Sequence, residues 1–168
     1  IGVIDTGFDF MHPAFRDAEG NSRIVHVWDQ SGRNGNTPSM GYGVVFDTPE
    51  LIRSAAHDVS RDTHGTHVAA IAASSADVYK GMAPESDIVV VATDKSESGI
   101  IDALAYLLDY AEKEKKPIAI NLSMGTVIGF KDGTDPIASM IDELLDKSGK
   151  KCLMAIAAGN EGHRNSTI

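Results

Sequence analysis

The sequence has one cysteine, fewer basic than acidic residues, and no long apolar run. A single cysteine, Cys152, excludes an internal disulfide, and its apolar surroundings predict a packed, unreactive thiol. The 15 lysines and arginines against 24 acidic residues give a net charge of -9, which argues against nucleic acid or an anionic membrane as a partner. No apolar run approaches the roughly 20 residues of a transmembrane helix, so no membrane span is expected.

The remaining composition, 42% hydrophobic and 23% charged, is typical of a globular domain, and 168 residues are one domain's worth of chain. Apolar runs and helical periodicities alternate along it. Strands are predicted near 1–5, 23–29, 87–93, 117–123 and 151–158, and helices near 49–57, 64–75, 99–114 and 135–148. This alternation predicts an α/β fold with three layers, a doubly wound, mostly parallel sheet between helices.

An acidic residue ends the first apolar run. Ile1 to Ile4 form a short, β-branched stretch, Asp5 follows, and Thr6-Gly7 is a turn dipeptide. This pattern predicts a buried strand that delivers Asp5 to the carboxyl edge of the sheet. Taken alone, it is equally compatible with an aspartate that only caps the next turn.

The second motif is His64-Gly65-Thr66-His67-Val68-Ala69, whose small residues favour a helix packed close to the sheet, capped by Asp62 or Thr63. His64 then lies in the first turn, where the positive helix end disfavours an imidazolium ion. A buried carboxylate would favour the charged form, and these opposing effects suit a general base near neutral pH.

Metal binding is the rival interpretation of this helix, because His64 and His67 share it. The zinc-protease pattern, however, needs histidines four residues apart with a glutamate after the first. Gly65 stands in that place, and the histidines are three apart. We therefore expect His67 to be a structural residue.

The third motif follows an apolar run at Lys151 to Ala158, which predicts another buried strand. Gly159-Asn160-Glu161-Gly162 comes next. An asparagine held between glycines at a strand end can donate its side-chain amide to a developing oxyanion. The alternative is an ordinary asparagine-containing turn.

Together, Asp5-Thr6-Gly7, His64-Gly65-Thr66-His67-Val68-Ala69 and Ala157-Ala158-Gly159-Asn160-Glu161-Gly162 make the chain resemble the subtilisin-like serine proteases, or subtilases. The resemblance implies serine endopeptidase activity on protein or peptide substrates through an acyl-enzyme. By it Asp5 orients the base, His64 is the base and Asn160 is the oxyanion donor. It also implies the substrate-binding residues Gly99, Ser123, Met124, Gly125, Ala157, Ala158 and Gly159.

The nucleophile of that family is absent from the 168 residues. No Gly-Thr-Ser-Met-Ala type segment occurs, and neither Ser123 nor Ser166 is followed by Met-Ala. We expect residues 1–168 to be an incomplete catalytic domain, truncated on its C-terminal side and inactive alone. Such a truncation predicts exposed apolar surface and oligomer formation. The alternative is a pseudoprotease or regulatory protein-binding module on the same fold.

The resemblance also carries weaker implications. It implies a secreted or cell-envelope location and no cofactor for the chemistry. A structural calcium ion is an open option, although no dedicated ligand spacing occurs. Asp94 to Gly99 is a short, charged version of a substrate-binding loop. Val27-Trp28-Asp29-Gln30 with Gly41-Tyr42-Gly43 resembles a subtilase branch that includes bacterial germination proteases.

Overall fold

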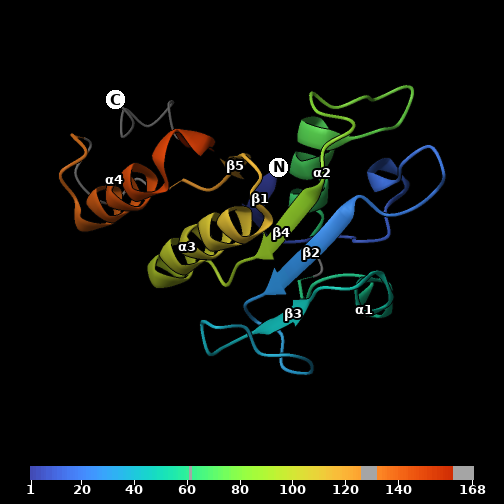
Figure 1. Ribbon diagram of the computed structural model, residues 1–168, viewed down its shortest axis with the longest axis horizontal. Helices are drawn as coiled ribbons and strands as arrows, with labels where there is room; N and C mark the ends of the chain where they lie inside the picture. Colours follow the sequence, from blue (N-terminus) through green and yellow to red (C-terminus); the bar gives the residue numbers. More distant parts are fainter. Residues whose placement is uncertain (61, 126–131, 161–168) are drawn as a thin grey trace.

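The structure, a computed structural model, describes residues 1–60, 62–125 and 132–160, and its core is a six-stranded sheet (Figure 1). The strand order is β3-β2-β4-β1-β5-β6. All neighbours are parallel except β3, which is antiparallel to β2. The strands are β1 (Gly2–Asp5), β2 (Ile24–Asp29), β3 (Val44–Phe46), β4 (Ile88–Ala92), β5 (Ile118–Leu122) and β6 (Cys152–Ile156).

Helices cover the two faces of this sheet. They are α1 (Pro49–Ala55), α2 (His64–Ala73), α3 (Glu97–Glu114) and α4 (Pro136–Ser148), with short 3-10 turns at Pro13–Phe15 and Gly149–Lys151. Side chains alternate across a strand, so Ile4 of β1 packs with α3 and α4, whereas Val3 packs in the core that includes Ala69 of α2. Figure 1 shows α3 and α4 together, apart from α2. The three-layer, doubly wound α/β prediction is confirmed.

The sequence-based expectations fail at three places. The short strand β3, antiparallel at one edge, was not expected. Helix α3 begins at Glu97, so half of the expected Asp94 to Gly99 loop is helical, with Ser96 as its cap. The strand predicted over 151–158 is confirmed as β6, but its predicted burial is wrong, because Leu153 is 71% exposed and Ile156 51%. In the described part of the chain β6 is the last strand, and α4 covers only one of its faces.

The register brings the sequence motifs to one edge. Ile4 pairs with Leu122, and Leu122 pairs with Ile156, so Asp5, Ser123 and Ala157 follow in a row at the carboxyl ends of β1, β5 and β6. Open α/β sheets bind ligands at this edge. Among the described helices, even the 18-residue α3 is too polar to cross a membrane.

Candidate active site

A buried carboxylate and a half-exposed imidazole form the centre of the site. Asp5 is 1% exposed, and its Oδ1 lies 2.8 Å from Nδ1 of His64, whose side chain is 49% exposed. The same Oδ1 accepts a hydrogen bond from the Thr6 backbone N–H at 2.7 Å. Oδ2 is buried without a hydrogen-bond partner among the described residues. The contact with Asp5 leaves Nε2 of His64 as the ring nitrogen that can exchange a proton with a substrate or nucleophile.

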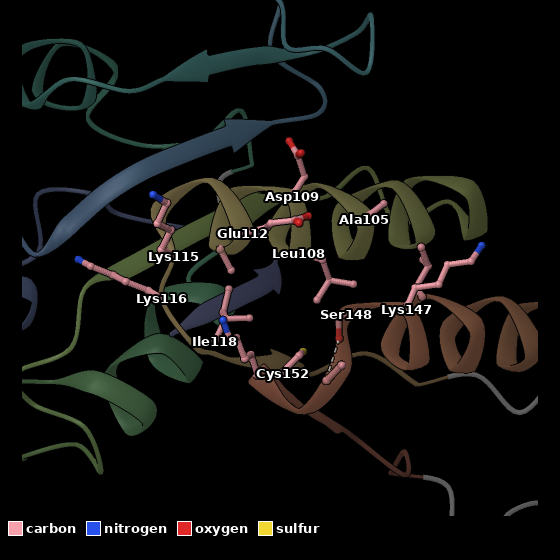
Figure 2. A pocket seen from close by; sticks show the side chains of 14 residues that line it. Ala105, Leu108, Asp109, Glu112, Lys115, Lys116, Ile118, Lys147, Ser148 and Cys152 are labelled. Carbon is pink, nitrogen blue, oxygen red and sulfur yellow. Dashed lines mark hydrogen bonds between the residues drawn. The ribbon is translucent and has the colours of Figure 1, made fainter.

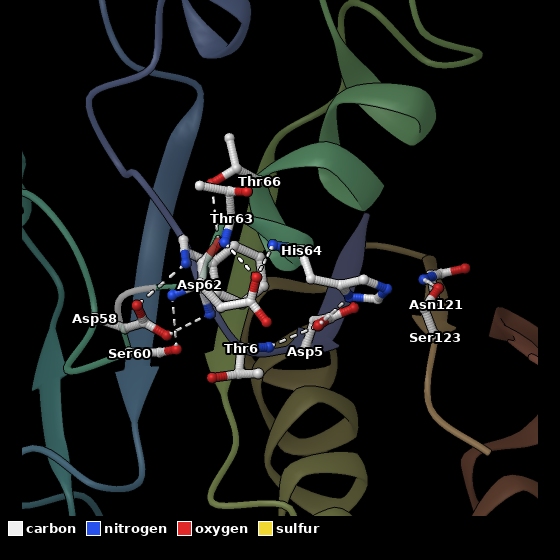
Figure 3. Close-up of polar contacts among 12 residues, drawn as sticks. Asp5, Thr6, Asp58, Ser60, Asp62, Thr63, His64, Thr66, Asn121 and Ser123 are labelled. Atoms are coloured by element: carbon white, nitrogen blue, oxygen red, sulfur yellow. Dashed lines mark hydrogen bonds and ion pairs between the residues drawn. The ribbon is translucent and has the colours of Figure 1, made fainter.

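Local bonds at the start of α2 hold His64 in place (Figure 3). Asp62 Oδ1 accepts hydrogen bonds from the backbone N–H groups of Thr63 at 2.7 Å and His64 at 3.3 Å. Of the two expected caps, Asp62 supplies the side-chain bonds, and Thr63 makes none. The carboxylate satisfies N–H groups that have no partner within the helix.

Two glycines allow the Asp5 turn to approach α2 closely. Gly7 has φ of +84°, a left-handed conformation, and a Cβ there would lie 2.6 Å from the backbone of Asp62. A Cβ on Gly65 would meet the ring of Phe8 at 2.8 Å. Gly65 N–H donates to Thr6 O at 2.8 Å, which ties the helix to the turn.

Thr66 makes a second tie between the helix and the turn. Its backbone N–H and its hydroxyl both donate to Gly7 O, at 3.0 and 3.1 Å, and its hydroxyl accepts from the Asp9 N–H at 2.8 Å. The three bonds fix the first turn of α2 against the segment that follows Asp5. The position of the His64 ring relative to Asp5 is therefore fixed by these backbone ties as well as by the direct contact between the two side chains.

A second buried carboxylate, Asp58, was not anticipated from the sequence. It is 2% exposed, and its two oxygens accept hydrogen bonds from the Gly7 and Phe8 backbone N–H groups, at 2.8 and 3.1 Å. Burial raises the pKa of Asp58, and those two hydrogen bonds partly oppose the rise. An aspartate in a polar loop carries no signal that separates it from a solvated residue, so only the structure shows this contact.

The predicted substrate-binding segments at β5 and β6 lie side by side. The Ala157 N–H donates to Leu122 O at 3.0 Å, and a Cβ on Gly125 would be 3.1 Å from Gly159 Cα. Ser123 and Met124 precede Gly125, and Ala158 lies between Ala157 and Gly159, so six of the seven predicted residues belong to this pair of segments. In Figure 3 Asn121 and Ser123, whose side chains hydrogen-bond at 2.8 Å, lie on the side of the His64 ring away from Asp58.

Two predicted residues stand apart from these segments. Gly99 is buried in the first turn of α3, where its N–H donates to Ser96 Oγ at 2.9 Å and its carbonyl accepts from Gln30 Nε2 at 2.7 Å. Both backbone groups are engaged inside the protein, and contact of Gly99 with substrate stays a prediction. Asn160 is exposed beyond β6, and the Glu161-Gly162 end of its motif lies outside the described residues. Its oxyanion role also stays a prediction.

Metal binding gains no support from the geometry. His64 contacts Asp5, whereas His67 is exposed one turn further along α2, so the prediction of a packed structural role for His67 is wrong. Across residues 1–60, 62–125 and 132–160, no cluster of three or more histidine, cysteine or acidic side chains is placed to hold a metal ion.

A cavity of about 500 Å³ between α3 and α4 is separate from this site (Figure 2). Leu108, Ile118 and Cys152 line it, with Lys115 and Lys147 at its rim. Burial raises the pKa of the Cys152 thiol, which disfavours the reactive thiolate. None of the predicted site residues lines this cavity, so it is not part of the candidate active site.

Comparison with known sequences finds a family and individual proteases that resemble this chain. The sequence profile of the Subtilase family (peptidase S8) matches residues 1–168. Over 96% of its length the chain is 29% identical to the subtilisin-like protease PopC of Myxococcus xanthus, of which it covers 33%. It has the same identity and coverages with the thermophilic serine proteinase of Bacillus sp. strain AK1. The chain thus spans about a third of the length of these curated relatives.

Solved structures share the fold. The CspB protease of Clostridium perfringens matches with a TM-score of 0.75 and 30% identity, over 96% of this chain and 36% of that one. Sphericase matches with a TM-score of 0.60 at 21% identity, over 95% of this chain and 46% of that one, which supports the fold alone.

Proposed function

This chain belongs to the subtilase family, and we propose that it supplies the aspartate and the histidine of the catalytic triad of a serine endopeptidase. Asp5 orients the base, His64 is the general base, and Asn160 donates to the oxyanion. The serine comes from outside the 168 residues. The single observation that carries the proposal is the 2.8 Å contact between a carboxylate 1% exposed and an imidazole 49% exposed.

The proposed reaction proceeds through an acyl-enzyme. As the serine Oγ attacks the scissile carbonyl carbon, Nε2 of His64 accepts its proton. Asp5 holds the ring through Nδ1 and stabilises the imidazolium ion that forms. The same proton then passes to the leaving amine, and water repeats the sequence to release the acid. Asn160 donates its amide N–H to the tetrahedral oxyanion at both stages.

The position of His64 at the start of α2 supports this role. The first turn of the helix places Nδ1 of the ring 2.8 Å from the buried Asp5 carboxylate. The negative charge of that carboxylate can stabilise the imidazolium ion that forms when the serine is attacking.

Protein or peptide substrates are the proposed partners. Ser123 to Gly125 and Ala157 to Gly159 would flank the bound chain. Apart from Met124 their side chains are small, which would leave space for a sizeable apolar residue. A secreted or cell-envelope location is proposed from the family resemblance, and cell fractionation with an antibody would test it.

The experiment compares the full-length protein with its His64→Ala and His67→Ala variants. A fluorophosphonate probe should label the parent at serine, and a casein or peptide substrate should be cleaved. His64→Ala should lose nearly all turnover, because it removes the base. His67→Ala is the matched control and should retain activity, because His67 is exposed one turn away. A well-folded parent that neither reacts with the probe nor cleaves any substrate would favour the pseudoprotease alternative.

A further inference from the structure

Three hydrogen bonds join Asp58 to the catalytic turn, the segment Thr6-Gly7-Phe8 that directly follows Asp5. The Asp58 carboxylate accepts from the N–H groups of Gly7 and Phe8, and its own N–H donates to Phe8 O at 3.2 Å. Gly7 is only two residues beyond Asp5, so these bonds hold the turn immediately after the residue that orients His64. Figure 3 shows the carboxylate directed at the backbone of this turn.

Asp58 is itself fixed to the sheet. The next residue, Val59, donates its N–H to Oδ2 of Asp29 at 3.2 Å. Asp29 ends β2 and is 3% exposed, and its Oδ1 accepts from the N–H groups of Ser31 and Gly32. The position of Asp58 is thus set from the end of β2, independently of α2.

The catalytic turn is therefore held from two directions. Thr66 of α2 binds the carbonyl of Gly7, whereas Asp58 binds the N–H of the same residue. Burying a carboxylate is costly unless its oxygens are hydrogen-bonded. Here each Asp58 oxygen accepts a hydrogen bond from a backbone N–H of the turn. These bonds lower the cost of burying the carboxylate and give both N–H groups an acceptor.

From this geometry we infer that Asp58 is a positioning residue for the proposed protease. It holds the Gly7-Phe8 turn so that Oδ1 of Asp5 faces Nδ1 of His64. This inference rests on the proposed function, and it assigns to Asp58 no contact with substrate. A displacement of about 1 Å in a catalytic group can cost about a hundredfold in rate, so loss of this support should be measurable.

The test uses Asp58→Ala and Asp58→Asn in the full-length protein. Asp58→Ala removes both acceptors and should lower kcat by about 10-fold to 100-fold with KM little changed. Asp58→Asn keeps one acceptor and places an NH2 group against the other N–H, so its kcat should be intermediate. Circular dichroism would confirm the folded state, and Asp58→Asn carries the test if the alanine variant does not fold.

Asp17→Asn is the matched control. Asp17 also accepts backbone N–H bonds, from Glu19 at 3.0 Å and Asn21 at 2.7 Å, but it precedes β2 at the opposite end of the sheet. It should retain the parent kcat. An equal loss of kcat in Asp17→Asn would show a general effect of losing a capped turn and would overturn the inference.

A second readout follows the hydrogen bond itself. The proton shared by His64 Nδ1 and Asp5 Oδ1 gives a low-field NMR resonance, which should weaken or shift in both Asp58 variants and persist in Asp17→Asn. A folded Asp58→Ala protein with parental kcat and an unchanged resonance would reduce Asp58 to a structural role and refute the inference. If the parent protein shows no proteolysis, the proposed function fails, but the resonance still reports whether Asp58 positions Asp5.

Discussion

Replacing Asp5 by asparagine separates the charge of this residue from its shape. The two side chains are nearly isosteric, so the fold should persist. Oδ1 serves both the Thr6 N–H and His64 Nδ1, whereas Oδ2 is buried without a partner among the described residues. This asymmetry gives the asparagine two orientations, and both impair the reaction.

In the first orientation the amide oxygen takes the place of Oδ1. It keeps both hydrogen bonds, but the NH2 group is then buried at the Oδ2 position. In the second orientation the NH2 group faces the Thr6 N–H, which is also a donor, and it fixes the His64 ring with its proton on Nε2. That tautomer cannot accept the serine proton. Either way, the negative charge that stabilises the imidazolium ion is lost.

We expect kcat of the full-length Asp5→Asn protein to fall by about four orders of magnitude, the loss known for this substitution in another serine protease triad. Such a loss corresponds to about 5 kcal/mol of transition-state stabilisation. The assay is steady-state hydrolysis of a chromogenic peptide, with active-site titration to count competent enzyme. Asp9→Asn is the control, because Asp9 is exposed and its Oδ1 accepts a local bond from the Met11 N–H, with no other partner among the described residues. A loss of less than tenfold for Asp5→Asn would refute the proposed role.

Three further predictions follow, one for the full-length protein and two for the 168-residue chain alone. Asn160→Ala should lower kcat by about a hundredfold to a thousandfold with little change in KM, the effect expected of one oxyanion donor; unchanged turnover in peptide hydrolysis would contradict that role. The 168-residue chain alone should not react with a fluorophosphonate probe, and stoichiometric labelling detected by mass spectrometry would show that a serine within it is activated. The same chain should self-associate, because Leu153 and Ile156 are exposed on the last described strand. Leu153→Lys should shift the 168-residue chain toward monomer in sedimentation velocity. An unsubstituted 168-residue chain that is already monomeric at micromolar concentration would contradict the expectation.

Periodicity was sufficient to predict most of the sheet and its helices. The runs around Val3 and Val90 are β-branched and buried along their whole length, so local pattern and tertiary environment agree there. The run at 151–158 looks equally apolar in sequence, yet Leu153 is exposed. A sequence pattern reports how apolar a strand is, but it does not report whether another element covers each face. Strand β3 has only three residues, too few for alternation to be recognised.

The subtilase resemblance implied that Asp5 orients His64, and periodicity placed each of the two residues at the end or the start of a regular element. Asp5 ends a strand and His64 begins a helix, so the fold fixes both Cα positions. Asp58 could not be predicted in this way. It lies in the irregular segment between α1 and α2, and its partners are backbone N–H groups of residues 50 or more positions away. Every residue except proline has the same backbone N–H donor, so the sequence does not indicate which N–H groups Asp58 will bind.

Hydrogen bonds from outside the sheet hold the turn that follows Asp5. The sheet register places Asp5 beside Ala92 and in line with Ser123, but its strand pairing ends at Asp5 and does not include the turn that follows. That turn contains Gly7, whose missing side chain permits the approach to Asp62 and also removes restraint on the backbone. Hydrogen bonds from Thr66 and Asp58 replace the lost restraint from opposite directions. The short Asp5–His64 contact therefore rests on two side chains outside the proposed triad, which hold the carbonyl and the N–H of Gly7, and on the backbone bonds that Gly65 and Thr66 make to the same turn.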